Sequence, residues 1–167
     1  MERGRSVWLA GVVGVMVVAC GKDRSGHGQP AVTAPQGVDC GHTTCGSNFF
    51  VDAVQAGECA PGANCSLALT LVATGDFHIN DEYPYKFRAD DASGLTFLGT
   101  DTAGANVFSK AASNWQKTGP QTGTMSVAFQ APGKGKVSVS GTFKLSVCSA
   151  QNCQLESQSV TAPVTIR

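Results

Sequence analysis

Six of the seven cysteines in this 167-residue chain fall into three close pairs, Cys40/Cys45, Cys59/Cys65 and Cys148/Cys153. Paired cysteines can form structural disulfides, exchange disulfides with other thiols, or bind a metal as thiolates. An even number of cysteines outside the cytoplasm favours disulfides, and six cysteines allow fifteen pairings. The short spacings favour nearest neighbours, but Cys40 and Cys45 precede every expected strand, so their pairing stays open. The argument is clearest for Cys148, which closes one expected strand while Cys153 opens the next, because opposed residues on antiparallel strands lie within disulfide reach.

Zinc binding is the competing use of these side chains. Zinc prefers nitrogen and sulfur ligands, and the chain offers them at Cys40, His42, Cys45, Cys59 and Cys65. The C-x₂-C spacing typical of zinc sites is missing, and an oxidising compartment favours disulfides. We therefore assign Cys40, Cys45, Cys59 and Cys65 to structural disulfides, expect no metal or other cofactor, and interpret His42 as a solvated loop residue.

No other pattern in the chain points to catalysis. The sequence has no G-x-S-x-G elbow, no H-E-x-x-H and no Walker loop. His78 and Asp76 lie two residues apart, but spacing assigns no nucleophilic serine to them. A hydrolase is therefore not expected.

The first nineteen residues have the pattern of a signal peptide. Arg3 and Arg5 precede the apolar run Val7–Ala19, which is shorter than the roughly twenty residues that a membrane-spanning helix needs. The run ends in Val17-Val18-Ala19-Cys20, which resembles the lipobox of bacterial lipoproteins. That resemblance implies that residues 1–19 are removed and that Cys20 becomes a lipidated N-terminus. The alternative is an ordinary secretory signal with an incidental cysteine.

Residues 20–38 have the composition of a flexible tether, with several glycines and prolines and no aromatic side chain. The 12 basic and 12 acidic residues of the chain balance, which excludes a protein held on nucleic acid by bulk charge. The same balance leaves membrane attachment to the acyl chains. We therefore expect a lipid-anchored, extracytoplasmic protein of the bacterial cell envelope, facing the periplasm or in the outer membrane.

Residues 39–167 show the alternation typical of an antiparallel β-sandwich. Cys65–Ala73 places Leu67, Leu69 and Leu71 on one face, and Lys136–Cys148 alternates over a longer span. Seven or so short strands in a domain of this length favour two packed sheets. The other predicted strands are Asn48–Val54, Tyr83–Ala89, Leu95–Leu98, Thr124–Gln130, Cys153–Ser159 and Val160–Ile166. Between them, Asp101–Thr122 lacks alternation and is expected to hold a short helix over Asn106–Gln116 or to be a long loop.

Two segments together resemble the N-terminal periplasmic domain of DsbD-type thiol:disulfide interchange proteins. These are Leu67–Ala89, with its Phe77-His78-Ile79-Asn80 turn, and Phe143–Ile166, with its Cys148-x₄-Cys153 spacing. The resemblance implies an immunoglobulin-like sandwich in which Cys148 and Cys153 form the redox pair that exchanges electrons with a periplasmic thiol or disulfide partner. It also implies an aromatic lid over that pair, for which Phe108 and Trp115 are the candidates. The alternative for both rings is burial in the core.

Two functions follow from these observations. The first is a membrane-anchored thiol–disulfide exchange module that acts through Cys148 and Cys153. The second is a non-catalytic envelope lipoprotein whose disulfides only stabilise it while it binds a protein partner or scaffolds the envelope.

Overall fold

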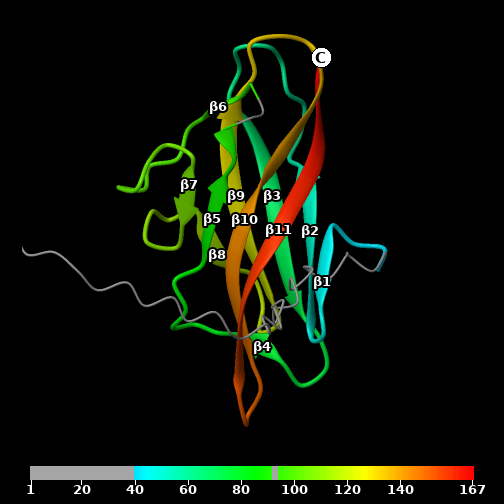
Figure 1. The fold of residues 1–167 in the computed structure, drawn as a ribbon, viewed down its shortest axis with the longest axis vertical. Coiled ribbons are helices and arrows are strands. Elements are labelled where there is room, and N and C mark those ends of the chain that lie inside the picture. The colour runs from blue at the N-terminus through cyan, green and yellow to red at the C-terminus, as the bar shows by residue number, and fades with distance from the viewer. Residues whose placement is uncertain (1–39, 92–93) are drawn as a thin grey trace, which may run out of the picture. The chain divides into compact units, whose positions relative to one another are not determined.

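The computed structural model describes residues 40–91 and 94–167, and this part of the chain is all-β. Its eleven strands form two antiparallel sheets (Figure 1). No helix within the described ranges is long and apolar enough to cross a membrane. The predictions for the signal peptide 1–19, for lipidation of Cys20 and for the tether 20–38 concern residues outside those ranges.

The first sheet has six strands in the order β1-β2-β3-β9-β6, and β8 also pairs with β9. Its central strand β3 buries every second side chain, including Leu67, Leu69 and Leu71, as the alternation predicted. The strands are β1 (Thr44–Gly46), β2 (Phe49–Gln55), β3 (Cys65–Ala73), β6 (Thr96–Phe97), β8 (Trp115–Lys117) and β9 (Thr122–Gln130).

The second sheet has five strands in the order β11-β10-β5-β7, and the short β4 also pairs with β10. Two strands of 14 residues each, β10 and β11, pair along their whole length and form a hairpin whose tip extends past β4 in Figure 1. The strands are β4 (His78–Ile79), β5 (Lys86–Ala89), β7 (Val107–Ser109), β10 (Gly135–Cys148) and β11 (Cys153–Ile166).

One hydrophobic core joins the two sheets. The first sheet contributes the β3 leucines and Phe129, and the second contributes a row of rings in register across β7, β5 and β10. The rings of this row are Phe108, Phe87 and Phe143, all fully buried. Burial of one face of each sheet stabilises the fold and leaves the opposite faces polar.

The segment from Asp101 to Thr122 differs from both of its predicted forms. It contains the short strands β7 and β8 and no helix. Each of these strands pairs with another strand, β7 with β5 and β8 with β9, so tertiary pairing rather than local pattern determines their structure. Residues 153–166 likewise form one continuous strand where the sequence predicted two.

Both lid candidates are core residues. Phe108 is fully buried and meets Phe97 edge to face, with ring centroids 6.2 Å apart. Trp115 is 9% exposed and stacks on Tyr85 at 4.0 Å between ring centroids. Neither ring contact involves a cysteine, and the core alternative accounts for the burial of both rings.

Candidate functional site

The six cysteines of the described ranges form three disulfides between nearest neighbours. The Cα atoms are 6.6 Å apart in Cys40–Cys45, 5.3 Å in Cys59–Cys65 and 4.0 Å in Cys148–Cys153. The predicted pairing is therefore confirmed, and these cysteines are not available as thiolate ligands. Within the described ranges, no group of three or more His, Cys, Asp or Glu side chains could hold a metal ion.

The three disulfides differ in the solvent exposure of their cysteines. Cys59 and Cys65 are 3% and 5% exposed and belong to the core cluster. Cys40 and Cys45 are both half-buried. Cys148 is 6% exposed, whereas its partner Cys153 is exposed. Only Cys148–Cys153, of the three, joins a buried cysteine to an exposed one.

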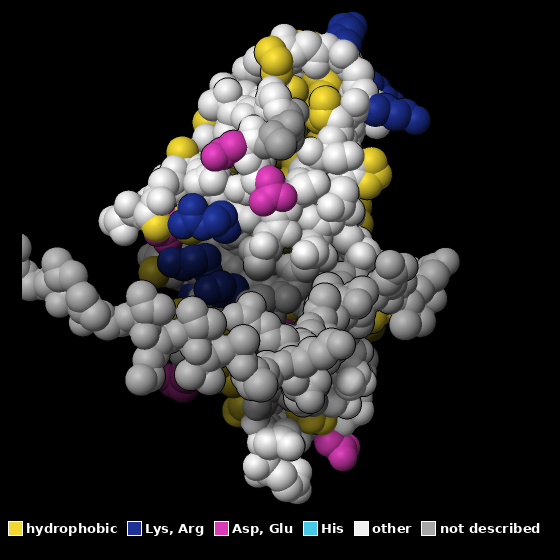
Figure 2. All heavy atoms as spheres, in the orientation of Figure 1, with side chains coloured by type: hydrophobic (Ala, Val, Ile, Leu, Met, Phe, Trp, Pro, Cys, Tyr) yellow, Lys and Arg dark blue, Asp and Glu magenta, His cyan; other side chains and the backbone are white. Residues whose placement is uncertain are grey.

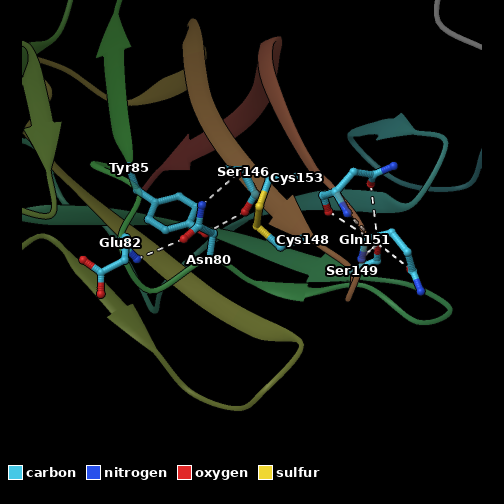
Figure 3. Close-up of a disulfide and its surroundings, with 9 residues drawn as sticks. Asn80, Glu82, Tyr85, Ser146, Cys148, Ser149, Gln151 and Cys153 are labelled. Atoms are coloured by element: carbon cyan, nitrogen blue, oxygen red, sulfur yellow. Dashed lines mark hydrogen bonds between the residues drawn. A yellow bond between two sulfur atoms is a disulfide. The ribbon is translucent and has the colours of Figure 1, made fainter.

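A tight turn positions this third pair. Cys148 is the last residue of β10 and lies opposite Cys153, the first residue of β11. The backbone N–H of Ser149 donates to the carbonyl of Asn152 at 2.8 Å, and the Ser149 hydroxyl accepts from the N–H groups of Gln151 and Asn152 at 3.2 Å each (Figure 3). These bonds hold the two strand ends in register. The four turn residues carry no charge, and in Figure 2 this end of the hairpin is an uncharged knob.

The other neighbour of Cys148 across the sheet is His78. In β4, His78 lies opposite Cys148 and Ile79 lies opposite Val147. Because directly opposed residues project from the same face of a sheet, His78, Cys148 and Cys153 form a row across three strands. Sequence analysis gave His78 no role, since a two-residue strand has no periodicity that could show its pairing with β10.

A partly buried group of hydrogen bonds supports β10 just before Cys148. The Tyr85 hydroxyl donates to the carbonyl of Ser146 at 2.6 Å, and Nδ2 of Asn80 donates to the Ser146 hydroxyl at 3.2 Å (Figure 3). The Glu82 N–H donates in turn to Oδ1 of Asn80 at 3.0 Å. Burial raises the pKa of the Tyr85 hydroxyl well above its usual value of 10.0. Tyr85 must keep its hydroxyl proton to donate to Ser146, so these hydrogen bonds hold the β4–β5 loop against β10 only while Tyr85 is neutral.

Replacing Tyr85 by Phe should lower the free energy of unfolding by about 1–3 kcal/mol, because the buried carbonyl of Ser146 loses its donor. Since the pKa of Tyr85 is raised in the folded state, its stabilising effect is present below pH 10 and is lost as the pH rises further. Urea unfolding at neutral and alkaline pH measures both effects. Tyr83→Phe is the control, since the Tyr83 hydroxyl makes no hydrogen bond in the described structure. Equal losses in the two variants would contradict the prediction.

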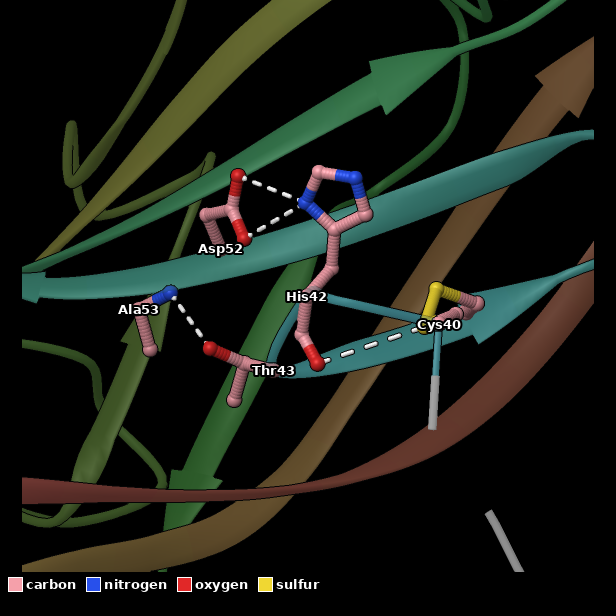
Figure 4. Close-up of polar contacts among 6 residues, drawn as sticks. Cys40, His42, Thr43, Asp52 and Ala53 are labelled. Atoms are coloured by element: carbon pink, nitrogen blue, oxygen red, sulfur yellow. Dashed lines mark hydrogen bonds and ion pairs between the residues drawn. A yellow bond between two sulfur atoms is a disulfide. The ribbon is translucent and has the colours of Figure 1, made fainter. Parts of the chain in front are cut away.

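A second cluster lies at β1 and β2, beside Cys40–Cys45. Nδ1 of His42 is 2.9 and 3.1 Å from the two carboxylate oxygens of Asp52 (Figure 4). The His42 ring also stacks on Phe50, with 3.7 Å between the ring centroids. The exposed His42 ring thus contacts Asp52 and stacks on Phe50, which its interpretation as a solvated loop residue missed. No hydroxyl or thiol within the described ranges bonds to its ring, so the pair lacks a nucleophile. The arrangement fastens the segment before β1 to β2.

Basic side chains gather on the outer face of β5 and β10. Lys86 lies opposite Lys144, with Arg88 two residues further along β5, and Figure 2 shows Lys and Arg side chains clustered on one face of the molecule. Hydrogen bonds from the Ser109 hydroxyl and the Ala103 N–H, together with Lys86 and Arg88, lower the pKa of Asp101. This carboxylate balances part of the positive charge of the cluster.

No protein-family model, curated protein or solved structure matches the chain. The likeness to DsbD-type domains therefore rests on the landmarks of the sequence, and the chemistry of the site rests on its own geometry.

Proposed function

We propose that this chain is an immunoglobulin-like sandwich that exchanges disulfides with a thiol protein of the bacterial envelope through Cys148 and Cys153. The supporting observation is the asymmetry of that disulfide, with Cys153 exposed and Cys148 buried at the end of a rigid hairpin. An attacking thiolate needs access to one sulfur only. The two core disulfide cysteines, Cys59 and Cys65, offer no such access.

The asymmetry assigns a role to each cysteine. A thiolate of the partner attacks Sγ of Cys153 and forms a mixed disulfide, and the bond to Cys148 breaks so that Cys148 leaves as a thiolate. A second thiolate of the partner then attacks the partner's own sulfur in the mixed disulfide and releases Cys153. The partner is oxidised by two electrons to a disulfide, and the domain is reduced to a dithiol that takes up two protons from solvent.

His78 is placed to assist the departure of Cys148. It lies directly opposite Cys148 across the β4–β10 pair and is itself exposed. A cationic imidazole beside a cysteine stabilises the thiolate form and makes that sulfur a better leaving group. Lys144 is four residues away along β10, so the His78 imidazole is the nearer basic side chain.

The proposed compartment fits this chemistry. Three disulfides in one small domain are typical of proteins outside the cytoplasm. The Val17–Cys20 lipobox and the tether 20–38 support attachment of the domain to a membrane through acyl chains on Cys20. A domain held this way can reach partners over the length of its tether.

Trapping of the mixed disulfide tests the exchange function. In Cys148→Ala the exposed Cys153 is a free thiol whose thiolate can attack the disulfide of the oxidised partner, the reverse of the proposed exchange, and one partner sulfur leaves as a thiolate. Because no Cys148 remains to displace the partner, a covalent adduct with an envelope protein should accumulate, visible as a reducible band on non-reducing gels. Cys153→Ala should yield little adduct, because the remaining Cys148 is 6% exposed.

Cys65→Ala is the matched control, since it frees the buried Cys59 and should trap nothing specific. If Cys148→Ala behaves like this control, exchange is wrong and the three disulfides only stabilise a non-catalytic envelope protein. In that alternative each disulfide, with a sequence separation of five or six residues, would contribute about 2 kcal/mol to stability.

A further inference from the structure

Strand β11 is the edge of the second sheet, and its hydrogen-bonding groups alternate in direction. Among the described strands it pairs only with β10. The Ser149–Asn152 pair is hydrogen-bonded, so the next pair along, Cys148–Cys153, belongs to the closely spaced type without mutual bonds, which agrees with its Cα separation of 4.0 Å. The N–H and C=O of Cys153 therefore point away from β10, toward the open edge. The same holds for Leu155 and Ser157.

The C-terminal half of this edge is closed. The side chain of Gln55 accepts from the Thr165 N–H at 2.7 Å and donates to the Thr165 carbonyl at 3.2 Å. The Arg167 N–H donates to the carbonyl of Cys59 at 2.9 Å. Pro163 occupies an outward position and has no N–H to offer. Natural sheets protect their edges by such means, so this half is not a template for another strand.

The N-terminal half is open, and it lies beside the exposed cysteine. No hydrogen bond within residues 40–91 and 94–167 satisfies the outward backbone groups of Cys153, Leu155 and Ser157. Leu155 is 66% exposed and projects from the same face as Cys153, two residues away. An open edge with an apolar side chain matches a surface on which an extended peptide adds a strand.

We propose that the partner's thiolate is delivered by an extended, cysteine-bearing segment that pairs antiparallel with Cys153–Ser157. This inference rests on the proposed exchange function and names how the partner binds. The partner's cysteine would lie opposite Cys153, at a cross-strand distance that permits a disulfide. It would extend the row of His78, Cys148 and Cys153 by one strand.

That row gives the geometry that displacement at sulfur requires. The attacking sulfur, the attacked sulfur and the leaving sulfur must lie close to one line. Residues in register on three neighbouring strands lie on such a line, perpendicular to the strands. Pairing with the edge therefore aims the partner's sulfur at Cys153 from the side opposite Cys148.

A short synthetic peptide with alternating Thr and Val and one central cysteine tests the pairing on the wild-type domain. Because Cys153, Leu155 and Ser157 direct their N–H and C=O outward, the peptide cysteine and the residues two and four positions before it in the peptide should bond to β11. N-methylation at either of those two preceding positions should slow formation of the mixed disulfide about tenfold, the effect of losing about one net hydrogen bond. N-methylation of the residues adjacent to the cysteine is the control and should change the rate little. Acid quenching and mass spectrometry measure the adduct.

A variant pair tests the same edge from the side of the protein. Leu155→Pro removes an outward N–H and keeps the ladder to β10, as Pro163 does in the same phase of the strand. This variant should form the mixed disulfide with the peptide about tenfold more slowly, and its rate of reduction by dithiothreitol should be unchanged. Leu155→Ala is the first control, because it removes the leucine side chain and keeps the backbone N–H. Ser159→Pro is the second control, because it introduces a proline outside the proposed segment Cys153–Ser157.

The outcomes separate this inference from the exchange function. If the methylated and unmethylated peptides react equally fast, strand addition is wrong while exchange stands. If neither the peptide nor dithiothreitol reacts at Cys153, the exchange function itself is wrong. A concentration-dependent dimer that Leu155→Pro abolishes would assign the edge to a second copy of the chain and overturn the inference.

Discussion

Under native conditions, dithiothreitol should reduce Cys148–Cys153 at least about tenfold faster than Cys59–Cys65. Attack on the first bond needs only the exposed Cys153, at the end of a hairpin. Attack on the second needs local opening of the core, because Cys59 and Cys65 are 3% and 5% exposed and pack with the buried cluster. Cys40–Cys45, with both cysteines half-buried, should react at an intermediate rate.

Differential alkylation measures these rates. Free thiols are blocked at intervals, the remaining disulfides are then reduced and labelled with a second reagent, and mass spectrometry assigns each cysteine. In denaturant the three bonds should react at similar rates, because the difference in burial is then lost. Equal rates in the native protein, or reduction of Cys59–Cys65 first, would contradict the assignment of Cys153 as the accessible sulfur.

The long strands could be predicted from sequence because their cause is local. Alternation of apolar and polar residues over nine residues in β3 and fourteen in β10 leaves one arrangement that buries Leu67–Leu71 and Val139–Val147 together. Nearest-neighbour disulfides follow for the same reason, since each pair closes a short turn. The short strands β1, β4, β7 and β8 could not be predicted in this way, because each consists of two or three residues that depend on pairing with a distant strand.

The site was predictable in its cysteines and not in their surroundings. Spacing identified Cys148 and Cys153, but the burial of one and the exposure of the other depend on packing around β10. The neighbourhood of His78 depends on β4, which lies about seventy residues earlier in the chain than the strand end that it meets. The open half of β11 is visible only once Gln55 is seen to close the other half.

Gly141→Ala should destabilise the domain by about 2–3 kcal/mol, a large effect for a single methyl group. Gly141 is buried in the middle of β10, between Ala89 on β5 and Val160 on β11. An added Cβ would overlap the carbonyl oxygen of Arg88 and would approach the Phe87 ring to 2.6 Å and the Ala89 Cα to 2.9 Å. The backbone of β5 cannot move away without breaking its pairing with β10.

Gly133→Ala is the matched control for this substitution, because a Cβ there has nothing within 4 Å in the turn before β10. It should change the free energy of unfolding by no more than about 0.5 kcal/mol. Urea unfolding followed by circular dichroism compares the two variants, and equal stability would contradict the close packing of β5 on β10. Because β10 also carries Cys148, loosening this contact should speed reduction of Cys148–Cys153 in Gly141→Ala and leave the rate in Gly133→Ala unchanged. Faster reduction in Gly141→Ala alone would show that the packing of β10 on β5 keeps Cys148 buried.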